Sequence, residues 1–269
     1  MSRRANRFQN SYEFVGKALV VGDSGAGKTS LMLRYCRNQF FYSQPISVGV
    51  DFAVKNIQVD NKEVRVQIWD TAGQEKYRSV VTGYFQKAHG IVLTYAVNDR
   101  ESFNSLPSWI EEIKQKAPED VAIVLVGAKA DIGEIPAQSE PDKEPRKISF
   151  SEGKAFADKH GIKFFEVSSK DNVNVDEVFY EMAKKIKTLL EEREKEREKK
   201  DEEEFDTLRR TTRLFPQPEK KGCFEAFLGL FKKKKAEDKV NVHVKKEKNE
   251  KIGREARSRI NCESAVRTN

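Results

Sequence analysis

Six short runs of apolar residues between residues 14 and 168 have the composition of β-strands. They are rich in Val, Ile and Phe, and turn residues separate them. The runs are 14–22, 50–59, 63–69, 90–97, 121–127 and 162–168. The second and third are joined by Asp60-Asn61-Lys62, which is typical of a hairpin turn, so we expect these two strands to be antiparallel.

Helical patterns separate the other strands. They cover residues 29–38, 102–117, 151–160 and 175–190. Alternation of strands and helices implies right-handed crossovers and a mostly parallel sheet that helices cover on both faces. The sequence therefore predicts an α/β fold with a six-stranded, mostly parallel sheet and one antiparallel edge strand.

Highly charged segments lie outside this globular part and lower the hydrophobic fraction of the whole chain. The chain of 269 residues is 38% hydrophobic and 35% charged, with a net charge of +7. Residues 213–269 hold 16 Lys/Arg and 8 Asp/Glu, so the basic character belongs to this tail. We divide the chain into an N-terminal extension (1–11), a globular domain (12–190), a charged segment (191–212) and the basic tail (213–269). The charges of 191–212 recur at helical spacing, which leaves a continued helix and a disordered segment as alternatives.

Composition also limits which cellular compartment and which classes of partner are expected. Cys36, Cys223 and Cys262 are widely spaced and form no metal or disulfide pattern, which favours the reducing cytosol. No apolar run is long enough to span a bilayer, and no signal peptide or myristoylation signal is present. A basic tail suits an anionic membrane, nucleic acid or an acidic protein. No nucleic-acid partner is predicted, since aromatic residues do not interleave with the basic ones.

The first strand is followed by "GDSGAGKTS", which has the spacing of a phosphate-binding loop. Its glycines let backbone N–H groups point at phosphate oxygens, and the next helix adds its positive N-terminus. Lys28 can reach the β- and γ-phosphates, and the hydroxyl of Thr29 can bind Mg²⁺. The predicted nucleotide-binding residues here are Gly22, Asp23, Ser24, Gly25, Ala26, Gly27, Lys28, Thr29 and Ser30. A glycine-rich turn that binds nothing is the alternative, which the flanking strand and helix disfavour.

The third strand ends in "WDTAGQE", residues 69–75. Asp70 is placed to bind Mg²⁺ through a water molecule, and Gly73 can bring its N–H to a γ-phosphate. Gln74 is a candidate to orient the attacking water. Together with the phosphate loop, this motif predicts a nucleoside triphosphatase.

These motifs, together with "SVGVDF" (47–52), resemble the small GTPases of the Ras superfamily, and specifically the Rab family. The segments 65–77, 78–95 and 108–114 are similar to Rab sequences nearly residue for residue. The likeness covers about residues 12–190. It implies a P-loop GTPase fold and a switch in vesicle and membrane trafficking that binds GTP or GDP with Mg²⁺ and hydrolyses GTP slowly.

The resemblance also assigns roles to single residues. Phe40 is expected to pack against guanine, and Ser47 to give its hydroxyl to Mg²⁺ and its N–H to the γ-phosphate. Asp131 is expected to bind guanine N1–H and the exocyclic amine. The remaining base-side residues are Lys129, Ser168, Ser169 and Lys170. The implied catalytic residues are Lys28 and Gln74, and the implied Mg²⁺ ligands are Thr29, Ser47 and, through water, Asp70.

Partners follow from the same resemblance. Phe52, Trp69 and Tyr84 are expected to offer an effector surface on a monomer. An exchange factor is also expected, and so is an activating protein, since no arginine in the switches is an obvious finger.

Two positions depart from the family pattern. Ala128 stands where the family has an asparagine that contacts guanine and ties the base loop to the phosphate loop. Its loss removes roughly 1–3 kcal/mol of nucleotide affinity, unless Ser169 or a water replaces the amide. Ser47 stands where the family has threonine. Serine keeps the hydroxyl ligand for Mg²⁺ but leaves χ1 less restricted than threonine does. An alternative function is therefore a catalytically weak scaffold, which the retained Lys28, Asp70 and Gln74 oppose.

We expect the tail to lack the usual prenyl anchor of the family and to offer a substitute for it. Cys262 lies outside the four-residue prenylation signal. Within 222–235, an apolar helical face (Phe224, Phe227, Leu228 and Phe231) precedes four lysines, and this pattern suits an anionic membrane. Docking of this face on the chain's own domain or on a partner helix is the alternative, and S-acylation of Cys223 is a weak signal. The predicted location is the cytosol, with the option of the cytosolic face of a membrane.

The other conspicuous side chains are expected to be structural. Cys36 is predicted to pack in the core, and Trp69 and Trp109 are predicted to be packing residues, with a partner-facing surface as the alternative for Trp69. His89 and His160 show no pattern that points to a ligand.

Overall fold

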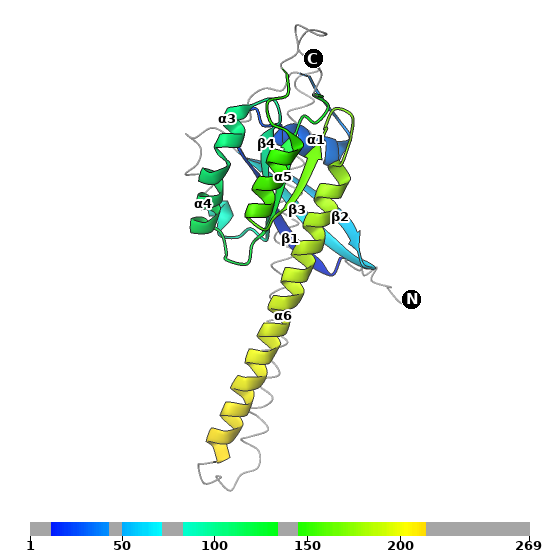
Figure 1. Cartoon of the computed structure of the whole chain (residues 1–269). Helices are drawn as coiled ribbons and strands as arrows, with labels where there is room; N and C mark the ends of the chain where they lie inside the picture. The colour runs from blue at the N-terminus through cyan, green and yellow to red at the C-terminus, as the bar shows by residue number, and fades with distance from the viewer. Residues whose placement is uncertain (1–11, 43–49, 72–82, 134–144, 214–269) are drawn as a thin grey trace, which may run out of the picture. The chain divides into compact units, whose positions relative to one another are not determined.

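The computed structural model describes residues 12–42, 50–71, 83–133 and 145–213, with side chains as far as residue 207. The chain divides into two compact units, residues 1–199 and 200–269. The first unit contains the sheet and its covering helices (Figure 1). Among the described residues, no helix combines the length and the apolar character needed to cross a bilayer.

One six-stranded sheet organises the first unit. Its strands are β1 (Phe14–Val21), β2 (Val50–Val59), β3 (Lys62–Thr71), β4 (Gly90–Ala96), β5 (Ala122–Ala128) and β6 (Lys163–Val167). Their order is β2-β3-β1-β4-β5-β6. Edge strand β2 is antiparallel to β3, and the other pairs are parallel, which confirms the predicted fold class. Asp60 and Asn61 both have a positive φ, as a two-residue type I′ hairpin turn requires.

The helices follow the predicted positions with one difference. They are α1 (Lys28–Arg37), α3 (Arg100–Asn104), α4 (Leu106–Lys116), α5 (Phe150–Lys159) and α6 (Val175–Arg213). The single helix expected over 102–117 is wrong, because α3 and α4 are separate. The side chain of Asp99 caps α3, which therefore starts early, and Pro107 lies in the first turn of α4. Proline lacks the N–H that a continuous helix needs, so it restarts the helix there.

Two apolar cores lie on opposite faces of the sheet (Figure 1). Along β1, Ala18 and Val20 belong to the core beneath α1 and α6. Leu19 and Val21 belong to the core beneath α4 and α5. Alternation with a period of two residues thus buries both faces of a central strand.

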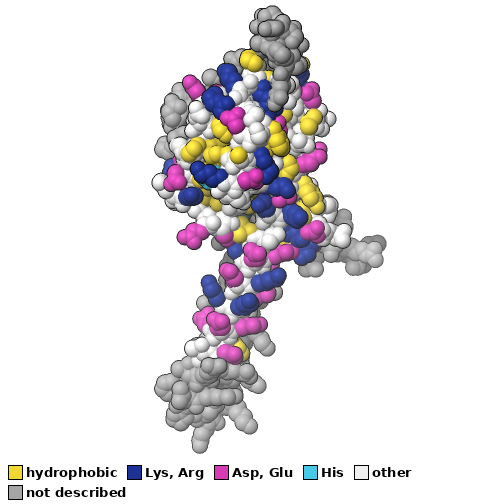
Figure 2. All heavy atoms as spheres, viewed as in Figure 1, with side chains coloured by type: hydrophobic (Ala, Val, Ile, Leu, Met, Phe, Trp, Pro, Cys, Tyr) yellow, Lys and Arg dark blue, Asp and Glu magenta, His cyan; other side chains and the backbone are white. Residues whose placement is uncertain are grey.

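The first half of α6 packs closely on the sheet. A Cβ atom added to Gly16 of β1 would lie 2.3 Å from Cγ2 of Ile186. The Ile186 side chain of the helix therefore packs directly on the backbone of β1 at this glycine. The helix then continues without interruption to Arg213, and residues 191–213 are helical in the structure. Figure 2 shows Lys/Arg and Asp/Glu side chains interspersed along the surface of this helix.

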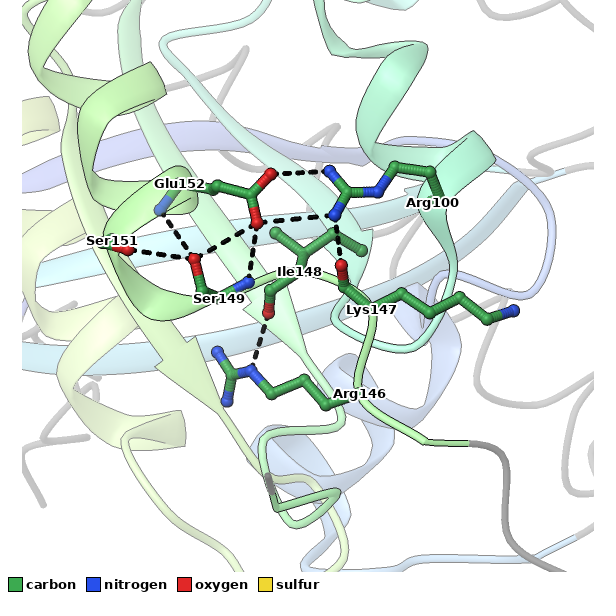
Figure 3. A network of polar contacts seen from close by, with 7 residues as sticks. All are labelled: Arg100, Arg146, Lys147, Ile148, Ser149, Ser151 and Glu152. Carbon is green, nitrogen blue, oxygen red and sulfur yellow. Dashed lines mark hydrogen bonds and ion pairs between the residues drawn. The ribbon is translucent and has the colours of Figure 1, made fainter. Parts of the chain in front are cut away.

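A polar network holds the segment 146–152, which lies just after the described residues resume at residue 145. Figure 3 draws Arg100, Arg146, Lys147, Ile148, Ser149, Ser151 and Glu152. Glu152 forms a capping box with Ser149 and an ion pair with Arg100 at 2.7 Å. Hydrogen bonding to Arg100 lowers the pKa of Glu152 to about 2. Arg146 pairs with the largely buried Glu166 of β6, so the network joins the start of α3, the start of α5 and the edge of the sheet.

Two side chains that were expected to be structural, Cys36 of α1 and His89 before β4, are partly buried. Burial raises the pKa of Cys36 to about 11, which leaves a thiol packed against the core. His89 has a partner that the sequence does not reveal, because its Nδ1 accepts the backbone N–H of Lys17 at 3.1 Å. Burial lowers the pKa of His89 to about 4, so this bond between β1 and the start of β4 is made by a neutral imidazole.

Candidate functional site

The loop between β1 and α1 wraps tightly at the carboxyl ends of the parallel strands. Gly22, Gly25 and Gly27 all have a positive φ, of 136°, 77° and 92°. A Cβ atom on Gly22 would lie 2.0 Å from the carbonyl oxygen of Thr94, so only glycine fits there. Ser24 is exposed at the tip of the loop, Ala26 is buried, and Ser30 lies in the first turn of α1. This geometry suits backbone binding of an anion at a helix N-terminus.

Lys28, the first residue of α1, is buried with 5% of its surface exposed. Its Nζ donates a hydrogen bond to the carbonyl oxygen of Asp23 at 2.6 Å. Burial lowers the pKa of Lys28 to about 8, and the charges of Asp70 and Asp23 oppose this shift. The ammonium group is therefore folded along the loop, where an anion would offset its cost of burial.

Thr29 and Asp70 form the other half of this cluster. The hydroxyl of Thr29 donates to Oδ2 of Asp70 at 2.6 Å. Asp70 is 1% exposed, and burial raises its pKa to about 6, while Thr29 and Lys28 lower it. Oδ1 of Asp70 is buried and accepts no hydrogen bond from the described residues. A hydroxyl beside an unpaired buried carboxylate oxygen offers the hard oxygen donors that Mg²⁺ prefers, so these residues fit that ion.

Trp109 connects α4 to the phosphate loop. Its indole N–H donates to Oδ1 of Asp23 at 2.8 Å, and its ring is 3% exposed. The prediction that Trp109 packs in the core is confirmed, but its polar contact was missed. Because the backbone carbonyl of Asp23 accepts the bond from Lys28, Trp109 and Lys28 hold the same loop residue.

The predicted base-side residues gather where β5 and β6 end side by side. Lys129 follows β5 with a φ of 65°, and this turn leads to the exposed Asp131. Ser168 follows β6, is 1% exposed, and donates from Oγ to Oδ1 of Asp131 at 3.0 Å. Oγ of Ser168 also accepts the backbone N–H of Asp171 at 3.0 Å. Since β5 and β6 are parallel neighbours, their two loops meet at one edge of the sheet.

Ala128 closes β5 directly beneath the phosphate loop. Its side chain is 2% exposed. A Cβ atom added to Gly27 would lie 3.3 Å from the Cβ of Ala128. The methyl group therefore faces the phosphate loop but has no hydrogen-bonding atom to offer it.

Arg34 of α1 reaches the loop that carries the predicted base-side residues Ser169 and Lys170. Its Nε donates to the carbonyl oxygen of Ser169 at 2.6 Å, and its Nη2 to that of Lys170 at 2.9 Å. Its Nη1 donates to Oδ1 of Asn38 at 3.1 Å. A basic residue in the last turn of a helix is common, so the sequence gives no signal of these long-range contacts.

Two groups of aromatic residues flank the site. Phe40 is half-buried and packs edge-on against Tyr42, with ring centroids 5.4 Å apart. The Nζ of Lys170 lies 5.9 Å from the ring centroid of Tyr42. Farther along the sheet, the ring of Trp69 lies 4.6 Å from that of Phe52 and 5.1 Å from that of Tyr84. The three residues expected at the effector surface are thus one continuous aromatic cluster.

Three predicted site residues lie outside the described residues. They are Ser47, Gly73 and Gln74. Their roles remain predictions.

Comparison with known proteins agrees with this arrangement. The sequence profile of the Ras family matches residues 17–188. The chain is 43% identical to the Ras-related protein RAB1BV of Beta vulgaris over 184 residues, which is 68% of this chain and 81% of the relative. It is 42% identical to the GTP-binding protein ypt2 of Schizosaccharomyces pombe over 177 residues, or 66% of this chain and 84% of that protein.

A third relative extends the aligned region. The Ras-related protein Rab-8B of Dictyostelium discoideum is 41% identical over 190 residues, which is 71% of this chain and 89% of the relative. The sheet order, the phosphate loop and these matches agree: the chain belongs to the Rab family of GTP-hydrolysing small GTPases in the Ras superfamily.

Proposed function

We propose that this chain is a guanine-nucleotide switch of membrane trafficking that binds GTP and GDP with Mg²⁺, hydrolyses GTP slowly and holds nucleotide more weakly than its relatives. The cluster of Lys28, Thr29 and Asp70 carries this proposal. It combines a buried ammonium group with an unpaired buried carboxylate oxygen beside a loop of positive-φ glycines. Burial of such groups is costly unless a ligand pairs with them.

Each residue of the cluster has a task on the phosphate side. The loop N–H groups bind phosphate oxygens, and Lys28 exchanges the carbonyl of Asp23 for the β- and γ-phosphates. Thr29 and Ser47 would hold Mg²⁺ directly, and Asp70 would hold it through water. When bound, the ion would supply positive charge against the phosphates. Gln74 orients the attacking water, and an activating protein supplies an arginine.

On the base side, Asp131 selects guanine. Its carboxylate accepts hydrogen bonds from guanine N1–H and the exocyclic amine, and the hydroxyl of Ser168 orients it at 3.0 Å. Lys129 lays its stem across the base, and Phe40 packs against it. Leaving a buried donor or acceptor without a partner costs about 1–3 kcal/mol, so an adenine in this site is disfavoured. Ala128 contributes no hydrogen bond, which is why we expect faster escape of nucleotide.

Partners act through two further surfaces. The aromatic cluster of Phe52, Trp69 and Tyr84 is the proposed effector surface, and an exchange factor reloads the site. The segment 222–235, which lies outside the described residues, is proposed to bind an anionic membrane.

The proposal is tested on the purified full-length chain. Guanine nucleotide is expected to copurify with it, and slow release of phosphate from GTP, but not from ATP, is expected in single-turnover assays. Lys28→Ala should abolish nucleotide retention, because it removes the buried cation of the phosphate site. Lys159→Ala removes a charge from an exposed position of α5 and should change neither result.

The second candidate function, suggested by Ala128, is a scaffold that does not depend on nucleotide cycling. The same assay distinguishes it from a switch. Retained guanine nucleotide with no measurable phosphate release identifies a scaffold that cycles poorly. Equal retention of adenine and guanine nucleotides, or of neither, contradicts the proposed switch.

A further inference from the structure

Arg34 joins three segments that surround the proposed base site. Its Nε and Nη2 donate to the consecutive carbonyl oxygens of Ser169 and Lys170, at 2.6 and 2.9 Å. Its Nη1 donates to Oδ1 of Asn38 at 3.1 Å, in the turn that leads to Phe40. A guanidinium group has a planar fork of donors, so one arginine can hold several acceptors in a fixed mutual geometry.

The anchored loop leads to the residue that reads the base. Ser168 precedes the two held carbonyls, and its hydroxyl donates to Oδ1 of Asp131 at 3.0 Å. Arg34 fixes the backbone directly after Ser168 and thereby limits the directions in which that hydroxyl can point. The carboxylate of Asp131 is exposed, so its orientation depends on such contacts.

The same side chain connects the base side to the phosphate side. Arg34 lies in α1, the helix that begins with Lys28 and Thr29. At the end of β5, the methyl group of Ala128 meets the phosphate loop without a polar contact. Hydrogen bonds from Arg34 therefore supply a direct polar link between the helix of the phosphate loop and the base-side loop.

We propose that Arg34 is a positioning residue that sets the lifetime of bound guanine nucleotide and the preference for the guanine 2-amino group. It acts through the backbone of Ser169 and Lys170 and through the Ser168–Asp131 bond. The inference rests on the proposed function, since it concerns how the same site holds its base.

The test compares Arg34→Ala with Arg34→Lys and a matched control in the full-length chain. Lysine has one ammonium group and cannot donate to both carbonyls in the fixed geometry of a guanidinium fork. Arg37 also lies in the last turn of α1 but is exposed, so Arg37→Ala removes the same charge from the same helix end. Two quantities are measured: the dissociation rate of GDP, and the ratio of the affinities for GDP and inosine diphosphate, which lacks the 2-amino group.

For Arg34→Ala we expect GDP to dissociate about tenfold faster and the preference for GDP over inosine diphosphate to fall at least threefold, since two hydrogen bonds to the loop are lost. Arg34→Lys should give intermediate values for both, and Arg37→Ala should match the parent chain. An unchanged preference overturns the proposal even if the rate rises, because an arginine that only stabilises the fold leaves the choice of purine unaltered.

Folding is controlled separately. Thermal unfolding is recorded for every variant, and if Arg34→Ala does not fold, Arg34→Lys decides alone. A parent chain that binds no guanine nucleotide refutes the proposed function. A parent chain that binds GDP while the Arg34 variants behave like it refutes only the role of Arg34.

Discussion

Ala128, the last residue of β5, faces Gly27 of the phosphate loop. Its methyl group is buried, and a Cβ added to Gly27 would lie 3.3 Å from it. A longer polar side chain at residue 128 would therefore extend toward the loop backbone. From this geometry we expect a change of side chain at residue 128 to affect both the proposed base side and the phosphate loop.

Restoring an amide tests this relation. Ala128→Asn should raise the affinity for GDP by about one to two decades, because the amide regains hydrogen bonds that together contribute about 1–3 kcal/mol. Calorimetric titration with GDP measures the change. Ala128→Val adds bulk without an amide and serves as the control, so an equal gain for both substitutions, or none for Ala128→Asn, would disprove the assignment.

At the scale of elements, α6 depends on a glycine of the sheet. Gly16 of β1 is buried beneath Ile186, whose branched Cβ leaves Cγ2 little freedom to move. Further along the same helix face, a Cβ atom added to Gly90 of β4 would lie 2.2 Å from Sδ of Met182. The Met182 side chain is flexible and can move aside, so the contact at Gly16 is the stricter of the two.

Gly16→Ala is therefore expected to destabilise the folded chain by about 1–3 kcal/mol, through overpacking against Ile186. Chemical denaturation measures this change in the free energy of unfolding. Adding Ile186→Ala removes Cγ2 and should recover part of the loss beyond additivity, whereas adding Ile186→Val keeps Cγ2 and should recover none. Purely additive effects in both double variants would show that the helix does not meet Gly16 in this way.

For the molecule as a whole, local sequence determines most of what could be predicted. The six strands, the hairpin turn and the phosphate loop depend on neighbouring residues and on glycine positions, so they were predictable. The break between α3 and α4 was missed, since the helical periodicity continues across Ser105. The contacts of Arg34 and Trp109 were also missed, because they join residues that are 86 to 136 positions apart in the sequence.

The basic tail lies outside the described residues, but it leads to a prediction for the whole chain. If the apolar face of 222–235 enters a bilayer, Phe227→Glu/Phe231→Glu should abolish sedimentation with vesicles that contain phosphatidylserine, since the charges oppose burial of that face. Ala226→Glu/Gly229→Glu adds the same charge to the opposite side of the helical pattern and should reduce binding only modestly. Similar sedimentation of both variants would favour docking of this face on protein instead.

The chain contains two tryptophans, one bound to the phosphate loop and one in the proposed effector surface. The indole of Trp109 is hydrogen-bonded to Asp23 of the phosphate loop, and Trp69 lies between Phe52 and Tyr84. Indole emission responds to the hydrogen bonding and polarity around the ring. The protein therefore carries its own fluorophores, and substituting either tryptophan with phenylalanine would let nucleotide loading and the response of the proposed effector surface be followed separately, without a dye.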